Sequence, residues 1–227
     1  MKKIGVLTII NVNNYGAELQ AFALVKKLEK IGFDAEIINY LFYKNPRYKK
    51  TSISKPIKNI KTVDYLKEII YPYYNSIKSI PYFKSKKVRD QKFLKFHQCY
   101  TKMSEEYRSL NELYKKYKDY DVYLVGSDQV WNPNSKTNLE PYLLSFVKEN
   151  KIKASYASSF GVNEIDHKYH QFYNNFLKRF QQISVREKSG IDVLKSITKR
   201  KDVDWVLDPT FLLSKSDWLD YQSEALI

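Results

Sequence analysis

The sequence predicts an α/β fold, in which a Rossmann-like parallel sheet carries helices on both faces. Short apolar runs of strand length alternate with segments that repeat apolar residues at helical spacing, and this alternation is typical of parallel sheets. With 227 residues, of which 43% are hydrophobic, the chain has enough apolar side chains for a substantial core. No apolar run approaches the roughly 20 residues of a membrane-spanning helix, so the sequence predicts none.

The first strand–helix–strand unit occupies the N-terminal 40 residues. Residues 3–9 form an apolar run that predicts a buried strand, and residues 17–31 repeat apolar side chains at helical spacing. Gly32 follows this helix, where a residue that is free to adopt a positive φ favours helix termination. Residues 35–39 predict the second strand.

The middle of the chain, residues 41–120, departs from this alternation. It holds 20 basic and 7 acidic side chains, so it carries +13 of the net charge of +14, and it contains 12 of the 20 tyrosines. Residues 41–61 include two prolines and scattered lysines and predict partly irregular structure. Amphipathic helices are expected after them, at residues 63–71, 84–96 and 109–117. The sequence therefore predicts a basic, tyrosine-rich helical insertion.

Three interpretations of this basic segment remain open. The first is a set of solvated helices in which tyrosines pack half-buried. The second is a basic, aromatic surface that meets anionic lipid headgroups or a phosphorylated ligand. Nucleic acid is the least favoured partner, because no helix-turn-helix, zinc-finger or RNP-type motif accompanies the charge.

Strands and helices alternate again after residue 120. Strands are predicted at residues 121–125, 153–158, 183–185 and 203–206, and helices at residues 166–180 and 188–197. In parallel sheets covered by helices, ligands bind at the carboxyl ends of the strands. The loops that follow the predicted strands are therefore the places to look for a site.

The loop after the first strand, residues 11–16, offers two asparagines before a helix. Asn13 and Asn14 can hydrogen-bond a hydroxyl-rich ligand, while Tyr15 and Gly16 lead into a helix N-terminus with free N–H donors. The alternative is a structural turn in which an asparagine caps the helix.

The loop after the third strand contains a denser set of polar groups. Ser127, Asp128, Gln129, Trp131 and Asn132 supply a hydroxyl, a carboxylate, amides and an indole within six residues. Hydrogen bonds to hydroxyls and an aromatic face are what a sugar site needs. Structural alternatives remain, since the indole could fill the core and an Asn-Pro pair often initiates a turn.

Arg186 stands directly after the strand predicted at residues 183–185. A planar guanidinium binds carboxylates and phosphates through paired hydrogen bonds, so this residue is a candidate anion clamp. The alternative is an ion pair with Glu187 or with a helix terminus.

Signals for several other chemistries are missing from the sequence. There is no GxGxxG fingerprint, P-loop or GxSxG motif, and His167 and His170 lie outside any HExxH frame. Cys99 is the single cysteine, which excludes an intramolecular disulfide and a cysteine-based metal cage. We therefore expect no bound metal and no dinucleotide cofactor.

Five sequence blocks together carry a resemblance to a known family. They are NNYGA with LQA behind it, YD leading to GSDQVWNP, KASYASSFG, ISVREKSG and LDPT, beginning at residues 13, 120, 153, 183 and 207. In these blocks and their order, the sequence resembles the polysaccharide pyruvyl transferase family over almost its whole length.

The resemblance implies an enzyme that transfers the enolpyruvyl carbons of phosphoenolpyruvate onto two hydroxyls of a sugar. The product is a cyclic pyruvate ketal on a capsular, exopolysaccharide or cell-wall glycan, and phosphate is released. Phosphoenolpyruvate is then the donor substrate, and no further cofactor is expected. The acceptor would be a lipid- or nucleotide-linked glycan precursor, and nucleic acid is not an expected partner.

The resemblance also assigns roles to the candidate residues. Arg186 matches the family's arginine at this strand end, which implies contact with phosphoenolpyruvate, and Asp128 is the carboxylate placed to act as general base. The remaining residues would hold the acceptor sugar: Asn13, Asn14, Tyr15, Gly16, Ser127, Gln129, Trp131 and Asn132.

Members of the family are similar to two-domain GT-B glycosyltransferases. This implies that residues 1–206 form the N-terminal, Rossmann-like domain, and that residues 207–227 are a hinge and the truncated start of a second domain. Because the family's second half supplies a catalytic histidine and further basic contacts, the isolated chain is expected to be inactive. We expect it to be cytoplasmic, with peripheral contact to the inner face of an anionic membrane.

Two alternative functions belong to different classes. One is a GT-B glycosyltransferase that uses a nucleotide sugar as donor. The other is a non-catalytic remnant that binds glycan or a membrane surface. Titration with a nucleotide sugar, with phosphoenolpyruvate and with anionic vesicles would separate them.

Overall fold

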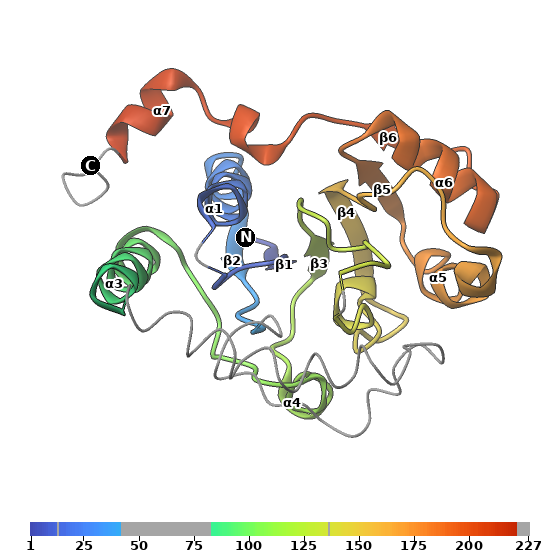
Figure 1. Cartoon of the computed structure of the whole chain (residues 1–227), viewed down its shortest axis with the longest axis horizontal. Helices are drawn as coiled ribbons and strands as arrows, with labels where there is room; N and C mark the ends of the chain where they lie inside the picture. Colours follow the sequence, from blue (N-terminus) through green and yellow to red (C-terminus); the bar gives the residue numbers. More distant parts are fainter. Residues whose placement is uncertain (13, 42–82, 136, 222–227) are drawn as a thin grey trace.

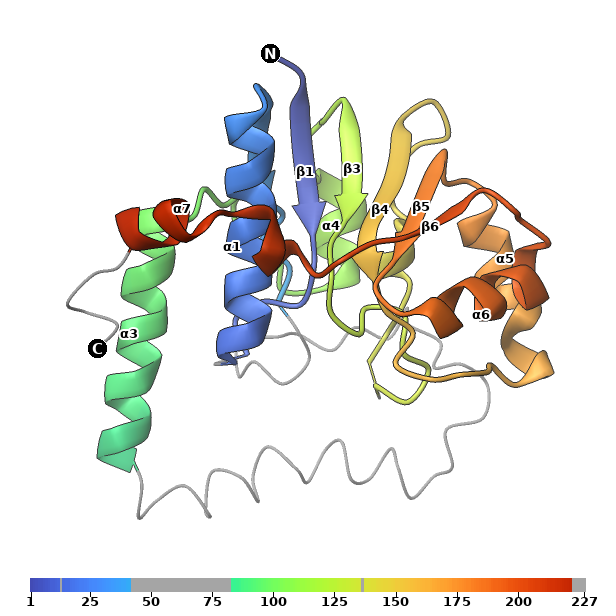
Figure 2. The same cartoon turned by 90° about the horizontal axis from the view of Figure 1, so that it is seen from above.

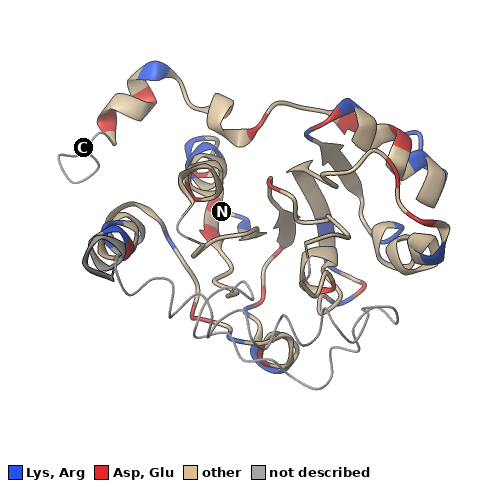
Figure 3. Ribbon diagram, in the orientation of Figure 1, with Lys and Arg blue, Asp and Glu red and all other residues tan. Residues whose placement is uncertain are grey.

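The computed structural model describes residues 1–12, 14–41, 83–135 and 137–221. Three predicted features lie outside these ranges. They are the position of Asn13, the irregular stretch expected at residues 41–61 apart from Leu41, and the helix expected at residues 63–71. Residues 42–82, also outside them, hold nine basic and two acidic side chains, which amounts to half of the net charge of +14. The described helix at residues 83–100 holds six basic side chains and one acidic one, whereas on the remaining described helices charges of both signs are interspersed (Figure 3).

The centre of the fold is a six-stranded sheet in the order β2-β1-β3-β4-β5-β6, and every pair of neighbours is parallel (Figure 1). The strands are β1 (Lys3–Leu7), β2 (Asp34–Ile37), β3 (Val122–Val125), β4 (Ile152–Ser158), β5 (Gln182–Val185) and β6 (Val203–Trp205). The chain first runs from β1 to β2 and then returns to the other side of β1 for β3. The strand order therefore reverses between β1 and β3, and in such sheets ligands bind at this switch point.

Helices cover both faces of the sheet because both faces of its strands are apolar. Helix α1 (Tyr15–Lys30) packs Leu24 and Val25 on Val6 in one core cluster. On the opposite face, α4 (Leu110–Lys116), α5 (His170–Leu177) and α6 (Lys188–Thr198) share a second cluster with β3 and β5 (Figure 1).

Strand β1 needs a glycine at position 5 because the Tyr120 ring packs directly against its backbone. A Cβ atom on Gly5 would lie 2.6 Å from the ring of Tyr120, which is itself buried. Gly32, which follows α1, has a φ of 96°, as predicted for the end of that helix.

Helix α3 (Phe83–Tyr100) lies beside α1, beyond the β2 edge of the sheet (Figure 1). Phe96 of α3 contacts Phe22 of α1 with ring centroids 5.3 Å apart. Of the helices described here, none is long and apolar enough to cross a membrane.

After β6 the chain runs back across the sheet to α1 (Figure 2). We call residues 206–213 the crossing segment. It contains the 3-10 helix η4 (Pro209–Leu212), which packs against α1, and it leads to α7 (Lys215–Asp220). Trp218 of α7 lies 5.7 Å from the ring of Phe22, and Asp217 pairs with Lys30. The described part of the segment expected to be a hinge thus packs on α1.

The predicted parallel sheet with helices on both faces is confirmed. One helix is shorter than expected: the segment at residues 166–180 forms a 3-10 helix, His167–Tyr169, followed by α5, which ends at Leu177. The Asp166 carboxylate accepts a hydrogen bond from the backbone N–H of Lys168 and so favours the tighter first turn.

Candidate functional site

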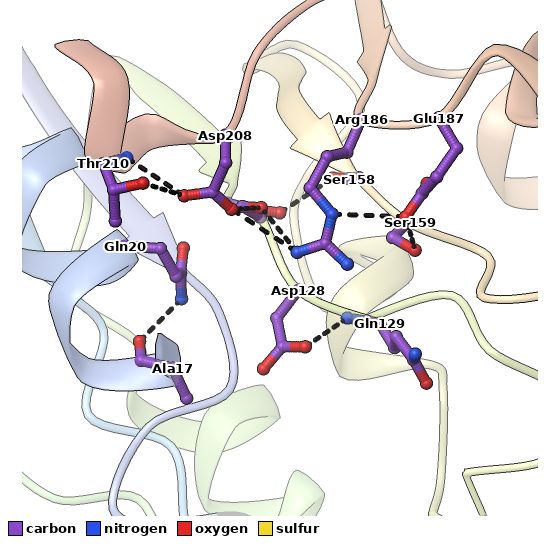
Figure 4. A network of polar contacts seen from close by, with 12 residues as sticks. Ala17, Gln20, Asp128, Gln129, Ser158, Ser159, Arg186, Glu187, Asp208 and Thr210 are labelled. Atoms are coloured by element: carbon purple, nitrogen blue, oxygen red, sulfur yellow. Dashed lines mark hydrogen bonds and ion pairs between the residues drawn. The ribbon is translucent and has the colours of Figure 1, made fainter. Parts of the chain in front are cut away.

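The loops after β1 and β3 flank the switch point, and the ends of β4 and β5 adjoin them. Figure 4 shows how side chains from the loop after β3, from the ends of β4 and β5, from α1 and from the crossing segment converge there. The region contains most of the residues that the sequence singled out, together with several that it did not.

At the start of α1, the structure shows the capping role that the sequence left open. The Asn14 side chain, at the N-cap, accepts a hydrogen bond from the backbone N–H of Ala17 at 3.2 Å. Tyr15 is 59% exposed, and its ring lies 4.9 Å from that of Phe93 on α3. Gly16 follows in the first turn, while Asn13 is outside the described residues.

A buried relay joins α1 to the loop after β3. The Gln20 Nε2 donates to Thr8 Oγ1 at 3.0 Å, and the Thr8 hydroxyl donates to the carbonyl oxygen of Ser127 at 2.6 Å. All three residues are at most 2% exposed. Because the hydroxyl proton of Thr8 goes to Ser127, the amide of Gln20 must present its nitrogen to Thr8. The sequence interpretation missed Thr8 and Gln20.

The loop after β3 is held against the loop after β4 by its backbone. The backbone N–H of Ser159 donates to the carbonyl oxygen of Asp128 at 3.0 Å, and that of Trp131 donates to the carbonyl oxygen of Ser159 at 3.1 Å. Asp128 adopts a φ of 77°, which costs a non-glycine residue about 1 kcal/mol. Its carboxylate accepts from the backbone N–H of Gln129 at 2.7 Å, so the side chain is partly turned toward its own loop.

Trp131 is a core residue, and this placement corrects the expectation that its ring faces a sugar. Its side chain is completely buried and packs near Phe160 and Phe180, with ring centroids 5.2 and 6.0 Å away. The indole Nε1 donates to the carbonyl oxygen of Tyr142 at 2.9 Å. The ring therefore has no surface to offer a ligand.

Asn132 and Gln129 contact each other at the outer end of the loop. Asn132 Nδ2 donates to Gln129 Oε1 at 2.7 Å, and Asn132 Oδ1 accepts from the backbone N–H of Asn134 at 2.8 Å. Asn132 is nearly buried and Gln129 is exposed. The Asn-Pro turn expected as an alternative is therefore present, and Gln129 remains accessible.

Arg186 lies between two carboxylates at the end of β5 (Figure 4). Its Nε is 3.2 Å from Glu187 Oε1, and its Nη1 is 3.3 Å from Ser127 Oγ and 3.4 Å from Asp208 Oδ2. The ion pair with Glu187 was the alternative that the sequence left open. Among the described residues, the Arg186 Nη2 has no hydrogen-bond partner, and the side chain is 27% exposed.

Hydroxyl groups hold both carboxylates in place. Asp208 Oδ1 accepts from the backbone N–H of Thr210 at 3.0 Å and from its Oγ1 at 2.9 Å, and Asp208 Oδ2 accepts from Ser127 Oγ at 2.9 Å. Glu187 Oε1 accepts from Ser159 Oγ at 2.7 Å. The sequence interpretation placed Asp208 in a hinge, although the Asp-Pro-Thr spacing is that of a side-chain-capped turn.

The site has more negative than positive charge. Arg186 is accompanied by Asp128, Glu187 and Asp208, which gives one cation and three carboxylates in this cluster. On the neighbouring strand β4, burial and, to a smaller extent, Asp208 raise the pKa of the Tyr156 phenol, so it stays protonated at neutral pH. In the described parts of the chain, no three His, Cys, Asp or Glu side chains are grouped so as to hold a metal ion.

A comparison with protein-family models matches residues 14–226 to the model described as polysaccharide pyruvyl transferase. Neither the curated proteins nor the solved structures yield a match. The matched range begins at Asn14, the N-cap of α1, and includes the loops after β3 and β4, the end of β5 and the crossing segment. Because this model spans nearly the whole sequence, the chain belongs to the polysaccharide pyruvyl transferase family.

Proposed function

We propose that the protein takes part in transferring pyruvate from phosphoenolpyruvate onto two hydroxyls of one sugar in a glycan precursor. Two C–O bonds form at C2 of the donor, while the C2=C3 double bond and the C2–O bond to phosphate are lost. Each of the two sugar hydroxyls loses a proton. C3 of the donor gains one proton, and the released phosphate takes the second. The reaction therefore needs an anion-binding group and groups that move protons.

The observation that carries this proposal is the placement of Arg186 in a chain of this family. The residue lies at the carboxyl end of β5, and its Nη2 is without a partner in the described part of the chain. A guanidinium with free N–H groups suits both anionic groups of phosphoenolpyruvate. We assign Arg186 to the donor.

Asp128 is the proposed general base. Its positive φ and its contact with the backbone N–H of Gln129 hold the carboxylate at the end of β3, in the same cluster as Arg186 (Figure 4). A strained backbone at a strand end is common where a side chain must be held in a reactive position.

The acceptor sugar is proposed to lie along the exposed side of the same loops. Tyr15 offers an exposed ring, Gln129 an exposed amide, and Asn14 and Gly16 the start of α1. Buried Ser127 instead supports Arg186 through the Asp208 carboxylate. Asn132 acts through Gln129, to which it is hydrogen-bonded.

The charge of the cluster implies that the donor needs additional cations. Phosphoenolpyruvate carries a carboxylate and a phosphate, whereas Arg186 already faces Glu187 and Asp208. Like charges in a partly buried site repel strongly, so a single arginine does not neutralise the donor there. We infer that basic groups outside this cluster complete the donor site.

The proposed setting is the cytoplasmic face of a membrane that carries a lipid-linked glycan acceptor. The support is the concentration of basic residues and tyrosines in residues 41–120, which suits anionic headgroups. Binding of the protein to anionic vesicles should then weaken steeply as salt is raised, and salt-independent binding would contradict an electrostatic contact.

Calorimetric titration of the 227-residue chain with phosphoenolpyruvate tests the donor assignment. We expect Arg186→Ala to weaken binding about tenfold to a hundredfold, since a hydrogen bond to a charged group is lost, and Arg186→Lys to restore it only in part. Arg200→Ala is the matched control, because Arg200 pairs with Asp202 and with carbonyl groups at the amino end of β5. Binding of a nucleotide sugar in place of phosphoenolpyruvate would favour a glycosyltransferase.

A further inference from the structure

Asp208 is the one carboxylate that connects the crossing segment to both β3 and β5. We propose that Asp208 is a positioning residue that sets the orientation of the Arg186 guanidinium. This inference rests on the proposed role of Arg186 in donor binding. It concerns how that arginine is presented to its ligand.

The Asp208 carboxylate is fixed independently of the arginine. Thr210 donates two hydrogen bonds to Oδ1, at 3.0 and 2.9 Å, and Ser127 donates one to Oδ2 at 2.9 Å. Ser127 is completely buried, and its carbonyl oxygen is held by Thr8. The carboxylate therefore has a defined position from three contacts of ordinary length before Arg186 is considered.

Arg186 is held by three longer contacts, one at Nε and two at Nη1, where Ser127 Oγ lies at 3.3 Å beside the Asp208 carboxylate. Nη1 lies 3.4 Å from Asp208 and Nε lies 3.2 Å from Glu187, both longer than the 2.7–2.9 Å of a strong charge-assisted bond. Contacts at Nε and Nη1 fix the plane of the group, and among the described residues none accepts a hydrogen bond from Nη2. The arrangement orients the arginine while leaving Nη2 available for an anion.

A purely electrostatic role and a positioning role of Asp208 predict opposite changes in phosphoenolpyruvate affinity when its charge is removed. A carboxylate beside Arg186 repels an anionic ligand, so neutralising it should tighten binding if only the local potential matters. If Asp208 positions the arginine, neutralising it should weaken binding, because Nη1 loses its carboxylate acceptor and keeps only the Ser127 hydroxyl. The sign of the change separates these two explanations.

The test uses Asp208→Asn in the full 227-residue chain. Asparagine caps a turn as well as aspartate does, so it keeps the contact with Thr210 but presents a neutral amide to Arg186. We expect phosphoenolpyruvate to bind about tenfold more weakly. We also expect the NMR order parameter of the Arg186 Nε–Hε group to fall, which reports side-chain rigidity without any ligand.

Asp202→Asn is the matched control. It removes the same charge and loosens another Asp–Arg pair, since Asp202 accepts from Arg200 Nε at 3.0 Å, but it lies away from the Arg186 cluster. Neither phosphoenolpyruvate affinity nor the Arg186 signal should change in this variant. A urea unfolding curve for each variant checks that the fold is retained.

Each outcome has a distinct meaning. Tighter binding by Asp208→Asn, or an unchanged Arg186 order parameter in the folded variant, overturns the positioning role. If the wild-type chain does not bind phosphoenolpyruvate but its Arg186 signal still depends on Asp208, the donor assignment fails and the positioning role stands. Weaker binding together with a more mobile arginine supports both.

Discussion

Replacing Trp131 by phenylalanine tests whether this residue belongs to the core or to a ligand site. The side chain is completely buried, and its Nε1 donates to the carbonyl oxygen of Tyr142 at 2.9 Å. Phenylalanine removes that donor and with it a buried hydrogen bond, at a cost of about 1–3 kcal/mol. The smaller ring also leaves a gap beside Phe160 and Phe180, which adds about 1 kcal/mol.

We therefore expect Trp131→Phe to lower the free energy of unfolding by about 2–4 kcal/mol. The measurement is urea unfolding followed by far-ultraviolet circular dichroism, with an unchanged m value as the check on two-state behaviour. Trp205→Phe is the control: this indole is 60% exposed and donates to the carbonyl oxygen of Arg186, so its loss should cost less than about 1 kcal/mol. Equal losses in the two variants would refute the core assignment and make the Trp131 ring available again as a sugar contact.

Two further predictions concern the first strand and the C-terminal helix. Gly5→Ala should lower the free energy of unfolding by about 1–3 kcal/mol, because its Cβ would lie 2.6 Å from the Tyr120 ring. Gly16→Ala is the control, since its Cβ would meet only the Asn14 side chain, at 3.3 Å. Equal urea midpoints for the two variants would contradict the prediction. The hydrogen bond from Lys30, and then that from the Ser214 backbone, lowers the pKa of Asp217 to about 2. This folded-state pKa lies below the ordinary value of 3.8, so the stabilisation is present at neutral pH and is lost as pH falls toward 2. The urea midpoint of Asp217→Asn should accordingly differ from the wild type at pH 6 and converge with it in acid; a difference that persists at pH 2 would argue against the contact.

Most of the fold follows from local patterns in the sequence. Apolar runs such as residues 3–9 and 183–185 predict strands because burial on both faces leaves almost no polar position. The end of α1 was predicted for the same kind of local reason, since Gly32 can adopt a positive φ without strain. Helix boundaries were less certain where a polar side chain redirects the first turn, as Asp166 does.

The site was predicted only where a single residue at a strand end is informative. Arg186 stands directly after β5 and Asp128 three residues after the end of β3, and the sheet topology brings those ends together. Trp131 was misjudged because the rings that enclose it come from segments about 30 and 50 residues further along the chain, beyond any local pattern.

Partners that are distant in sequence account for the residues that were missed. Asp208 is 81 residues from Ser127 and 22 from Arg186, and Thr8 is 119 residues from the Ser127 carbonyl that it binds. No spacing rule for helices or strands connects such positions. Their importance becomes visible only when the strand order and the path of the crossing segment are known.

The path of the crossing segment also bears on where the chain can be divided. A fragment that ends at residue 206, the predicted limit of the first domain, would retain all six strands. It would nevertheless lack the carboxylate beside Arg186 Nη1, and Phe22 on α1 would lose its contact with Trp218. The shortest chain that contains the whole sheet is therefore shorter than the shortest chain that keeps the site intact. A fragment with an intact site has to include the return of the chain to α1.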